Sequence, residues 1–460
     1  MLRFLFTAAI CLVATVVVLS GGANAQAGQK AKPSTQQSAP GLPSGTDAES
    51  GAPKAASLVT EQEQTGERFG VRMPVVTPKM RRYTLIRRVL YFTGTAFYWL
   101  LLWAILRSGL SRKLRDKADS VAKPRWLRLI VYYVLLTLLL NVASWPLSFY
   151  SGFVLQHQYG LSSQPFAQWI GDILKSLGVG LVTTIPVIWL VFWAMGRFPR
   201  RWPLVLWAAS IPIIAAAIFA QPLIVDPVFN KFTPLAQSPL RDRIHALAVQ
   251  AGIPNAPIVV SDVSKQTNTT NAYVNGIGSS ARIVLWDTLL KGKNKMPDDQ
   301  ILAIVGHEMG HYVLKHIYWG FLEAVGGLLI VIPLLRWTYD RLVYSRLQVW
   351  KLDGPGDYAA IPALLLTFAV ISFASNPVVN ALSRHVEHQA DEYGLQVTRN
   401  PKAMAEAFVA LSEQNLSDPQ PPKLITLLLG SHPPLNERID YALSYCPEYG
   451  CTDSPSDKAH

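Results

Sequence analysis

The chain has 460 residues, of which half are hydrophobic and only 16% are charged, and its formal net charge at pH 7 is +12. This composition is typical of a membrane protein rather than of a soluble domain. The positive charge does not indicate a nucleic-acid partner, because the basic residues cluster beside long apolar stretches, where they set topology and contact the lipid bilayer.

The first 25 residues have the pattern of a secretory signal peptide. Arg3 supplies the positive start, residues 4–19 form an apolar core, and Ala23-Asn24-Ala25 is a small-residue cleavage site. Residues 26–85 are predicted to be a disordered extracytoplasmic linker. The prediction rests on residues 26–66, which are rich in Ser, Gln, Gly, Ala and Pro and have almost no large apolar side chains to bury.

Six apolar stretches follow, each long enough to cross about 30 Å of hydrocarbon. The fifth contains Glu323, and an acid at membrane depth is expected to face the protein interior or water rather than lipid. The stretches lie at residues 89–106, 129–149, 176–196, 202–225, 317–335 and 359–382.

Basic residues predict the orientation of these spans, because Lys and Arg are enriched in cytoplasmic loops. Loops 107–128, 197–201 and 336–351 carry most of this charge and fall on one side, whereas residues 150–174 contain no Lys or Arg and fall on the other. The basic residues between 79 and 88 are the exception. We therefore expect an integral protein of a bacterial inner membrane in which the segment between the fourth and fifth spans and the segment after the sixth span lie on the periplasmic side.

A compact α/β segment lies between the fourth and fifth spans. Its pattern predicts an amphipathic helix over residues 239–250, a strand over 258–262, and a hairpin formed by residues 271–275 and 283–286. The segment ends in an apolar helix over residues 301–314, which has proline and acidic residues at its start.

That apolar helix carries the motif His307-Glu308-Met309-Gly310-His311. Residues four apart differ by about 40° around a helix, so the two histidines share a face and can bind one Zn²⁺. Glu308 can then reach a water on the metal. The alternative is a chance motif on a core helix, since so short a pattern is not rare.

A catalytic zinc usually has a third protein ligand, and residues 383–391 offer one. Glu387 and Asp391 are four residues apart and therefore share a helical face. This spacing suits a carboxylate ligand, Glu387, and a second acid, Asp391, that fixes the tautomer of a ligand histidine.

Three other histidines compete for the ligand role. His385 and His388 do not share the helical face of Glu387, and His316 lies about 140° round a continuous helix from His311. We expect these three histidines to be surface or packing residues.

Further motifs accompany the His-Glu-x-x-His motif and residues 383–391, and they stand in a fixed order along the chain. With them, the sequence resembles the integral-membrane zinc endopeptidases typified by the CAAX prenyl proteases, from about residue 125 to about residue 440. The motifs are Phe153-Val154-Leu155-Gln156-His157-Gln158-Tyr159-Gly160, residues 227–235, Asn271-Ala272-Tyr273, residues 282–290, and Ser431-His432-Pro433-Pro434-Leu435-Asn436-Glu437-Arg438.

The resemblance implies a zinc metalloendopeptidase with one zinc ion per chain and Glu308 as the general base. It places the Ser431–Arg438 segment at the active site, so His432 and Arg438 are expected to stabilise the oxyanion. It also implies that Asn271, Ala272 and Tyr273 form an edge strand that pairs with a polypeptide substrate. An ordinary core strand is the alternative for that segment.

The chain departs from the family in its predicted topology. The prenyl proteases have an extra first helix and a cytosol-facing site, whereas this chain has a signal peptide and an inverted orientation. Cys446 and Cys451 agree with the inversion, because they are close enough for a loop disulfide in an oxidising compartment.

The predicted fold is therefore mainly α, a polytopic bundle of about six transmembrane helices after a signal peptide, carrying a zincin-like α+β metalloprotease domain. The predicted units are the signal peptide (1–25), the linker (26–85), four membrane helices (86–235), the catalytic segment (236–316), two further spans (317–382), and the third-ligand helix with the substrate-site segment (383–460).

Two other functions fit parts of the sequence. One is a non-catalytic zinc-binding membrane scaffold or chaperone, but a purely structural site has no use for Glu308 and usually closes with a fourth protein ligand. The other is a membrane zinc hydrolase with a non-peptide substrate, against which the expected edge strand argues.

Overall fold

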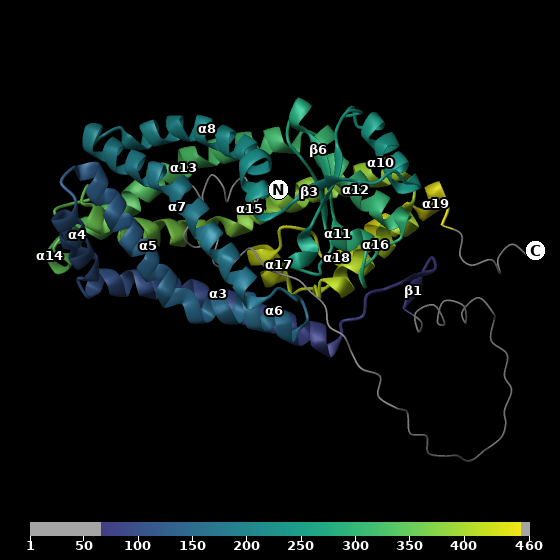
Figure 1. Cartoon of the computed structure of the whole chain (residues 1–460), viewed down its shortest axis with the longest axis horizontal. Helices are drawn as coiled ribbons and strands as arrows, with labels where there is room; N and C mark the ends of the chain where they lie inside the picture. Colours follow the sequence, from purple (N-terminus) through teal and green to yellow (C-terminus); the bar gives the residue numbers. More distant parts are fainter. Residues whose placement is uncertain (1–65, 452–460) are drawn as a thin grey trace, which may run out of the picture.

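The computed structural model describes residues 66–451. The predicted signal peptide, and the predicted linker up to residue 65, lie outside the described residues. Long helices form a bundle at one end of the molecule, and a mixed α/β domain forms the other end (Figure 1). The fold is mainly helical, as predicted.

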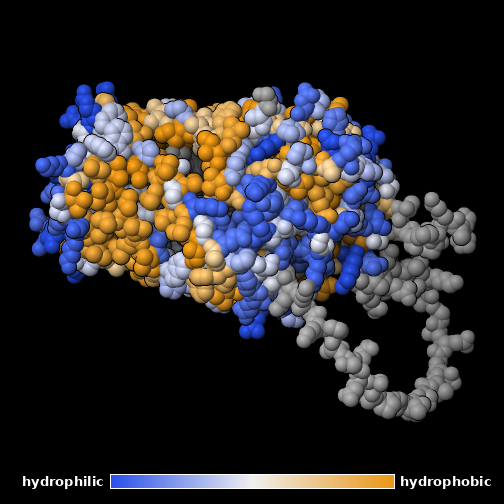
Figure 2. Space-filling view, viewed as in Figure 1, coloured by the Kyte–Doolittle hydropathy of each residue, from blue (hydrophilic) through white to orange (hydrophobic). Residues whose placement is uncertain are grey.

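Six helices are long and apolar enough to cross a membrane, and each contains one of the predicted stretches. Figure 2 shows a hydrophobic surface over the helical end, with hydrophilic residues at its outer rim and over the α/β domain. Within the fifth helix, Glu323 is half-buried and its Oε2 atom is enclosed by protein. The six helices are α3 (Pro78–Arg107), α5 (Arg125–Phe149), α7 (Phe166–Arg197), α8 (Trp202–Ala220), α13 (His316–Tyr344) and α15 (Ile361–Thr398).

Shorter elements extend or connect these helices. Helix α5 continues through a π-helix into α6 (Leu155–Gln158), and α8 continues through a second π-helix into α9 (Asp226–Phe229). The basic loop after α3 folds into an amphipathic helix, α4 (Leu110–Val121). It packs against α5 and against the turn before α15, where Arg115 forms an ion pair with Asp357. Helix α14 (Leu347–Trp350) closes the same end.

The linker prediction is wrong over its last part. Residues 67–72 form a hairpin, β1 (Glu67–Arg68) and β2 (Val71–Arg72), and α3 already begins at Pro78. Val71 is buried against the C-terminal helices, and the Thr77 side chain caps α3 by accepting from the Met80 amide. These few apolar side chains bury enough surface to order the segment. The prediction of disorder rested on the average composition of the segment, in which so few apolar residues are not apparent.

The α/β domain is built on a four-stranded sheet of order β3-β4-β6-β5. Strands β4 (Ile258–Ser261) and β6 (Arg282–Trp286) pair in parallel, and β3 (Phe232–Pro234) and β5 (Ala272–Asn275) pair antiparallel on the outside. Strand β5 is therefore an edge strand. It packs beside α12 (Asp298–Val313), the helix that carries the His-Glu-x-x-His motif.

Further helices complete this domain and enclose the motif helix. Helix α10 (Pro239–Gln250) packs on α12 from the sheet side, and its bounds match the predicted helix. Of the C-terminal helices, the first packs on the other side of α12, the third and fourth pack on the first, and the second packs on α15. In chain order they are α16 (Pro401–Gln414), α17 (Lys423–Leu429), α18 (Leu435–Ser444) and α19 (Cys446–Tyr449); a short helix, α11 (Asp287–Leu290), follows β6.

Helix α15 joins the membrane bundle to the metal-binding region without a break. The predicted boundary between residues 382 and 383 is not a structural one, because one 38-residue helix runs from Ile361 to Thr398. At about 1.5 Å per residue it is about 57 Å long, nearly twice the thickness of the hydrocarbon. Part of this helix must therefore lie outside the hydrocarbon, and its last four turns carry Glu387 and Asp391.

Glycines allow α15 to cross α12 in close contact. A Cβ atom on Gly306 would lie 2.9 Å from Thr398 Cγ2, and one on Gly310 would lie 3.1 Å from Ala390 Cα. From the other side, a Cβ on Gly394 would lie 2.9 Å from the backbone nitrogen of His307. The two backbones can approach this closely only because these positions have no side chain.

Substitution of Gly394 tests this requirement. We expect Gly394→Ala to push the His307 backbone away, to lower stability by about 1–3 kcal/mol and to weaken metal binding, because the new methyl group has no space. Gly326→Ala in α13 is the matched control, since its Cβ would meet open space. Thermal unfolding and metal titration in detergent measure both effects; equal results for the two variants would show that the close approach is not needed.

Candidate metal centre

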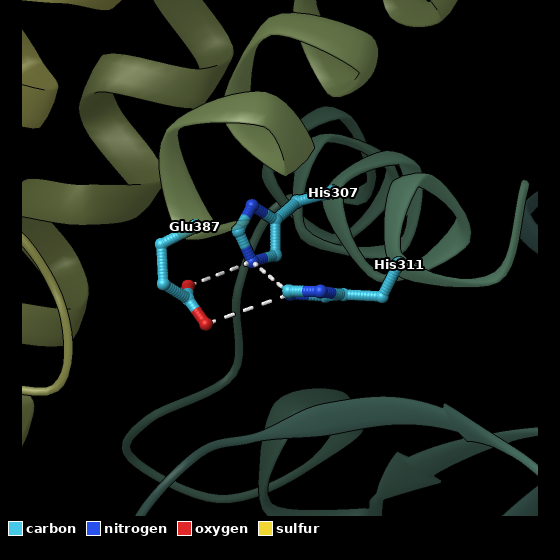
Figure 3. A group of neighbouring side chains, drawn as sticks. All are labelled: His307, His311 and Glu387. Carbon is cyan, nitrogen blue, oxygen red and sulfur yellow. Dashed lines mark hydrogen bonds and ion pairs between the residues drawn. The ribbon is translucent and has the colours of Figure 1, made fainter. Parts of the chain in front are cut away.

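Two helices bring three potential metal ligands together. His307 and His311 project from α12 toward Glu387 of α15 (Figure 3). The Nε2 atoms of the two histidines are 3.2 Å apart, and they lie 3.3 and 3.6 Å from the carboxylate oxygens of Glu387. All three residues are buried, and their ligand atoms lie within 4.8 Å of one another. Two imidazole nitrogens and one carboxylate are a donor set that fits a catalytic zinc.

Asp391 and Arg438 support His307 from behind. His307 Nδ1 lies 2.7 Å from Asp391 Oδ1, so this nitrogen carries the proton and Nε2 is left for a metal. Burial opposes a charge on His307, but the hydrogen bond and the charge of Asp391 raise its pKa above the ordinary value.

Arg438 makes two hydrogen bonds to Asp391. Its Nε lies 2.8 Å from Oδ2 and its Nη2 lies 2.6 Å from Oδ1, while the guanidinium stacks on Phe408 at 4.1 Å. Asp391 raises the pKa of Arg438, even though burial opposes its charge. Because the guanidinium is buried and directed at Asp391, its geometry favours an orienting role rather than the predicted oxyanion contact.

His316 supports His311 in a corresponding way. Its Nδ1 lies 3.0 Å from His311 Nδ1, and its Nε2 lies 3.2 Å from Gln389 Oε1. An amide oxygen only accepts, so His316 Nε2 donates to Gln389 and His316 Nδ1 accepts from His311. This arrangement again leaves the Nε2 atom of the ligand histidine for a metal. His311 itself is held neutral, because burial lowers its pKa well below the ordinary value.

The contact between His316 and His311 was missed by the sequence analysis. Treating the chain as one helix placed the two residues on different faces. The chain in fact breaks between them, because Lys315 is left-handed with φ 57° and α13 begins at His316. The sequence did indicate this break, because the predicted motif helix ends at residue 314 and the next predicted span begins at residue 317. Gln389 was missed because an amide on a helix carries no spacing signal of its own.

The other predicted site residues lie around this centre. Glu308 is half-buried beside the ligands, and burial raises its pKa to about 7. His432 is exposed, and its Nε2 lies 3.3 Å from Glu387 Oε2. His385 is exposed, and His388 is exposed and packs on Tyr441, as expected of surface or packing residues.

A disulfide lies close behind the supporting residues. Cys446 and Cys451, which the sequence marks as close enough to pair, are bonded. Cys446 is buried in an apolar cluster that includes Phe408, on which Arg438 stacks, and Ile439. The bond therefore holds residues 446–451 against the helix that carries Arg438.

The helical bundle and the buried His-His-Glu triad together define an integral-membrane metalloprotease. The sequence matches the model of peptidase family M48 over residues 234–445 and that of the CAAX prenyl protease N-terminal region, five membrane helices, over residues 76–231. The second match contains four of the candidate spans, α3, α5, α7 and α8. The chain belongs to peptidase family M48.

Individual relatives agree with this assignment. The uncharacterized metalloprotease YhfN of Bacillus subtilis (strain 168) is 36% identical over 365 residues, which cover 78% of this chain and 84% of the relative. CAAX prenyl protease 1 of Saccharomyces cerevisiae is 30% identical over 330 residues, covering 68% and 71%. The crystal structure of S. mikatae Ste24p superposes with a TM-score of 0.70 at 25% identity and covers 85% of this chain and 97% of that one. The resemblance to the CAAX prenyl proteases is confirmed.

Substitution of His316 tests its contribution to metal binding. We expect His316→Phe to weaken metal affinity by about 10–100-fold, because His311 Nδ1 loses its acceptor and the ring loses its orientation. His316→Asn supplies a new acceptor oxygen and should recover part of this loss. Competitive metal titration and the absorption spectrum of the cobalt-substituted protein measure the effect. Equal affinities for wild-type protein and His316→Phe would reduce His316 to a packing residue.

Proposed function

We propose that this protein is a zinc endopeptidase in which Glu308 is the general base. The observation that carries the proposal is the convergence of the buried ligand triad with Glu308 one position along the same helix. Zinc, when bound, supplies a Lewis acid for the scissile carbonyl and a water of lowered pKa. Glu308 accepts the proton of the attacking water and passes it to the leaving amine.

His432 is proposed to stabilise the oxyanion that forms on the carbonyl. Support comes from its position: it lies beside Glu387, and its side chain is 55% exposed. A hydrogen-bond donor at this exposed position can contact the oxyanion of a bound substrate. The adjacent Ser431 hydroxyl lies 3.1 Å from His432 Nδ1 and can hold the ring in this orientation.

Strand β5 is proposed to bind the substrate backbone. It is an edge of the sheet and packs against the motif helix, so an added strand would run past the ligand triad. Backbone pairing at Asn271, Ala272 and Tyr273 would give affinity with little sequence preference. An edge strand suits a polypeptide, which is the observation that favours a peptidase over a hydrolase of lipids or small molecules.

Substitution of Glu308 separates catalysis from metal binding. We expect Glu308→Ala to keep the metal but to lower peptide cleavage by several orders of magnitude, because the proton acceptor is gone. Glu387→Ala should lose metal as well as activity. Peptidase assays with proteomic identification of the products, combined with metal analysis, measure both. Cleavage by metal-loaded Glu308→Ala would refute the mechanism, and a wild-type protein that binds peptides without cutting them would support a scaffold or chaperone instead.

We propose that the site faces the periplasm of a bacterial inner membrane. The support is the basic charge of α4 and of the ends of α7 and α13, together with the Cys446–Cys451 disulfide, which needs an oxidising compartment. Several relatives are named CAAX prenyl proteases, but a periplasmic site would not meet prenylated cytosolic proteins. Polypeptides of the cell envelope, including misfolded membrane proteins, are then the substrate class.

Cysteine labelling tests this orientation. In a variant whose native cysteines are replaced by alanine, a cysteine placed at the exposed Ser444 should react with a membrane-impermeant maleimide in intact spheroplasts. A cysteine at the exposed Ser120 of α4 should react only after the membrane is broken. The opposite pattern would place the catalytic domain in the cytosol and restore prenylated and cytosolic proteins as substrates.

A further inference from the structure

A groove lies along the last turns of α13, where Pro203 at the start of α8 also lines it. These helix ends lie at the end of the bundle that carries α4 and α14 (Figure 1). The groove has a volume of about 680 Å³ and is far from the metal ligands, which lie where α12 crosses α15. Its lining combines basic, aromatic and small apolar side chains. They include Pro203, Pro333, Arg336, Trp337, Asp340 and Arg341.

The groove carries a net positive charge. Arg336 donates to the backbone carbonyl of Arg200 at 2.6 Å, and its Nε lies 3.5 Å from Asp340, so one arginine of the groove is already balanced by a carboxylate. Arg341 forms no ion pair within the described residues. Arg200 and Arg201 immediately precede α8 and add further positive charge at the same end.

One stripe of α13 leads from this charge into the membrane. Ile330, Leu334, Trp337 and Arg341 are spaced four, three and four residues apart, and therefore lie on one face of the helix. The first three are 72%, 41% and 56% exposed, and Leu204, which follows the lining residue Pro203 in α8, is 60% exposed. From Ile330 to Arg341 the stripe rises by about 16 Å.

The types of side chain along this stripe follow the same order as the parts of a phospholipid, from acyl chain to head group. Aliphatic side chains come first, then an indole at the depth where tryptophan is enriched at membrane interfaces, and then a guanidinium. A soluble anion would use Arg341 but would have no use for the exposed aliphatic face. A choline head group would need an open aromatic face, but the Arg341 guanidinium lies 5.2 Å from the centroid of the Trp337 ring and covers it.

We propose that the α8–α13 groove binds an anionic glycerophospholipid, with its phosphate at Arg341 and Arg336 and an acyl chain along Leu334 and Ile330. Basic pockets between membrane helices recognise such head groups by charge and hydrogen bonding. The inference does not depend on the proposed peptidase mechanism.

Retention of lipid by the full-length protein tests the proposal. The wild-type protein is reconstituted into vesicles of equal parts phosphatidylcholine and phosphatidylglycerol, extracted gently and analysed by native mass spectrometry. We expect it to retain phosphatidylglycerol over phosphatidylcholine, and expect Arg341→Gln to lower that retention roughly fivefold, as removal of one basic contact implies. Arg336→Gln should lower it as well, and Asp340→Asn should raise it, because the carboxylate that competes for the arginines is removed.

Lys123→Gln is the matched control. It removes the same charge from an exposed position at the same end of the molecule but outside the groove, so retention should be unchanged. Excess inorganic phosphate should not displace the retained lipid. The proposal is overturned if the two lipids are retained equally, because the groove then has no preference for an anionic head group. It is also overturned if Lys123→Gln and Arg341→Gln have equal effects, which would indicate general surface charge. Release of the lipid by phosphate would overturn it as well, because the groove would then bind a soluble anion.

Discussion

The close crossing of α12 and α15 is the constraint on which the rest of the structure depends. The metal ligands come from two helices far apart in sequence, and ligand atoms must meet within a few ångströms to share one ion. Gly306 and Gly310 on one helix and Gly394 on the other remove the side chains that would hold the backbones apart. The helices can then bring four side chains, His307, His311, Glu387 and Asp391, into one buried cluster, and the sheet, the C-terminal helices and the disulfide pack around it.

The two ligand histidines are oriented by different chemistry. His307 is held by a carboxylate that an arginine balances, whereas His311 is held by a neutral imidazole and an amide. Both arrangements protonate Nδ1 and leave Nε2 for the metal, but only one of them adds negative charge next to the ligand. A single charged partner favours metal binding, while a second would add another buried charge to desolvate. The residues that orient the two histidines come from α13, α15 and α18. All three helices must therefore be packed in place before the centre is formed.

The continuity of α15 links the chemistry to the bilayer. A helix of 38 residues crosses the hydrocarbon and still has several turns left for Glu387 and Asp391, so the centre lies a short distance from the membrane rather than on a separate mobile domain. Helix α13 begins at His316, directly after the motif helix, and runs back through the bundle to the α8–α13 groove. The catalytic region is thus fixed to the membrane helices through both α13 and α15.

The sequence by itself determined the spans, the motif helix and the three ligands, because apolar runs and a four-residue helical spacing are local properties of the chain. It also indicated Asp391 by the same spacing. Tertiary structure decided what depends on contacts between distant segments: that residues 67–85 are ordered, that Arg438 turns to Asp391, and that His316 reaches His311 across a two-residue break. Periodicity holds only within an unbroken helix, so a single left-handed residue is enough to remove its predictive value.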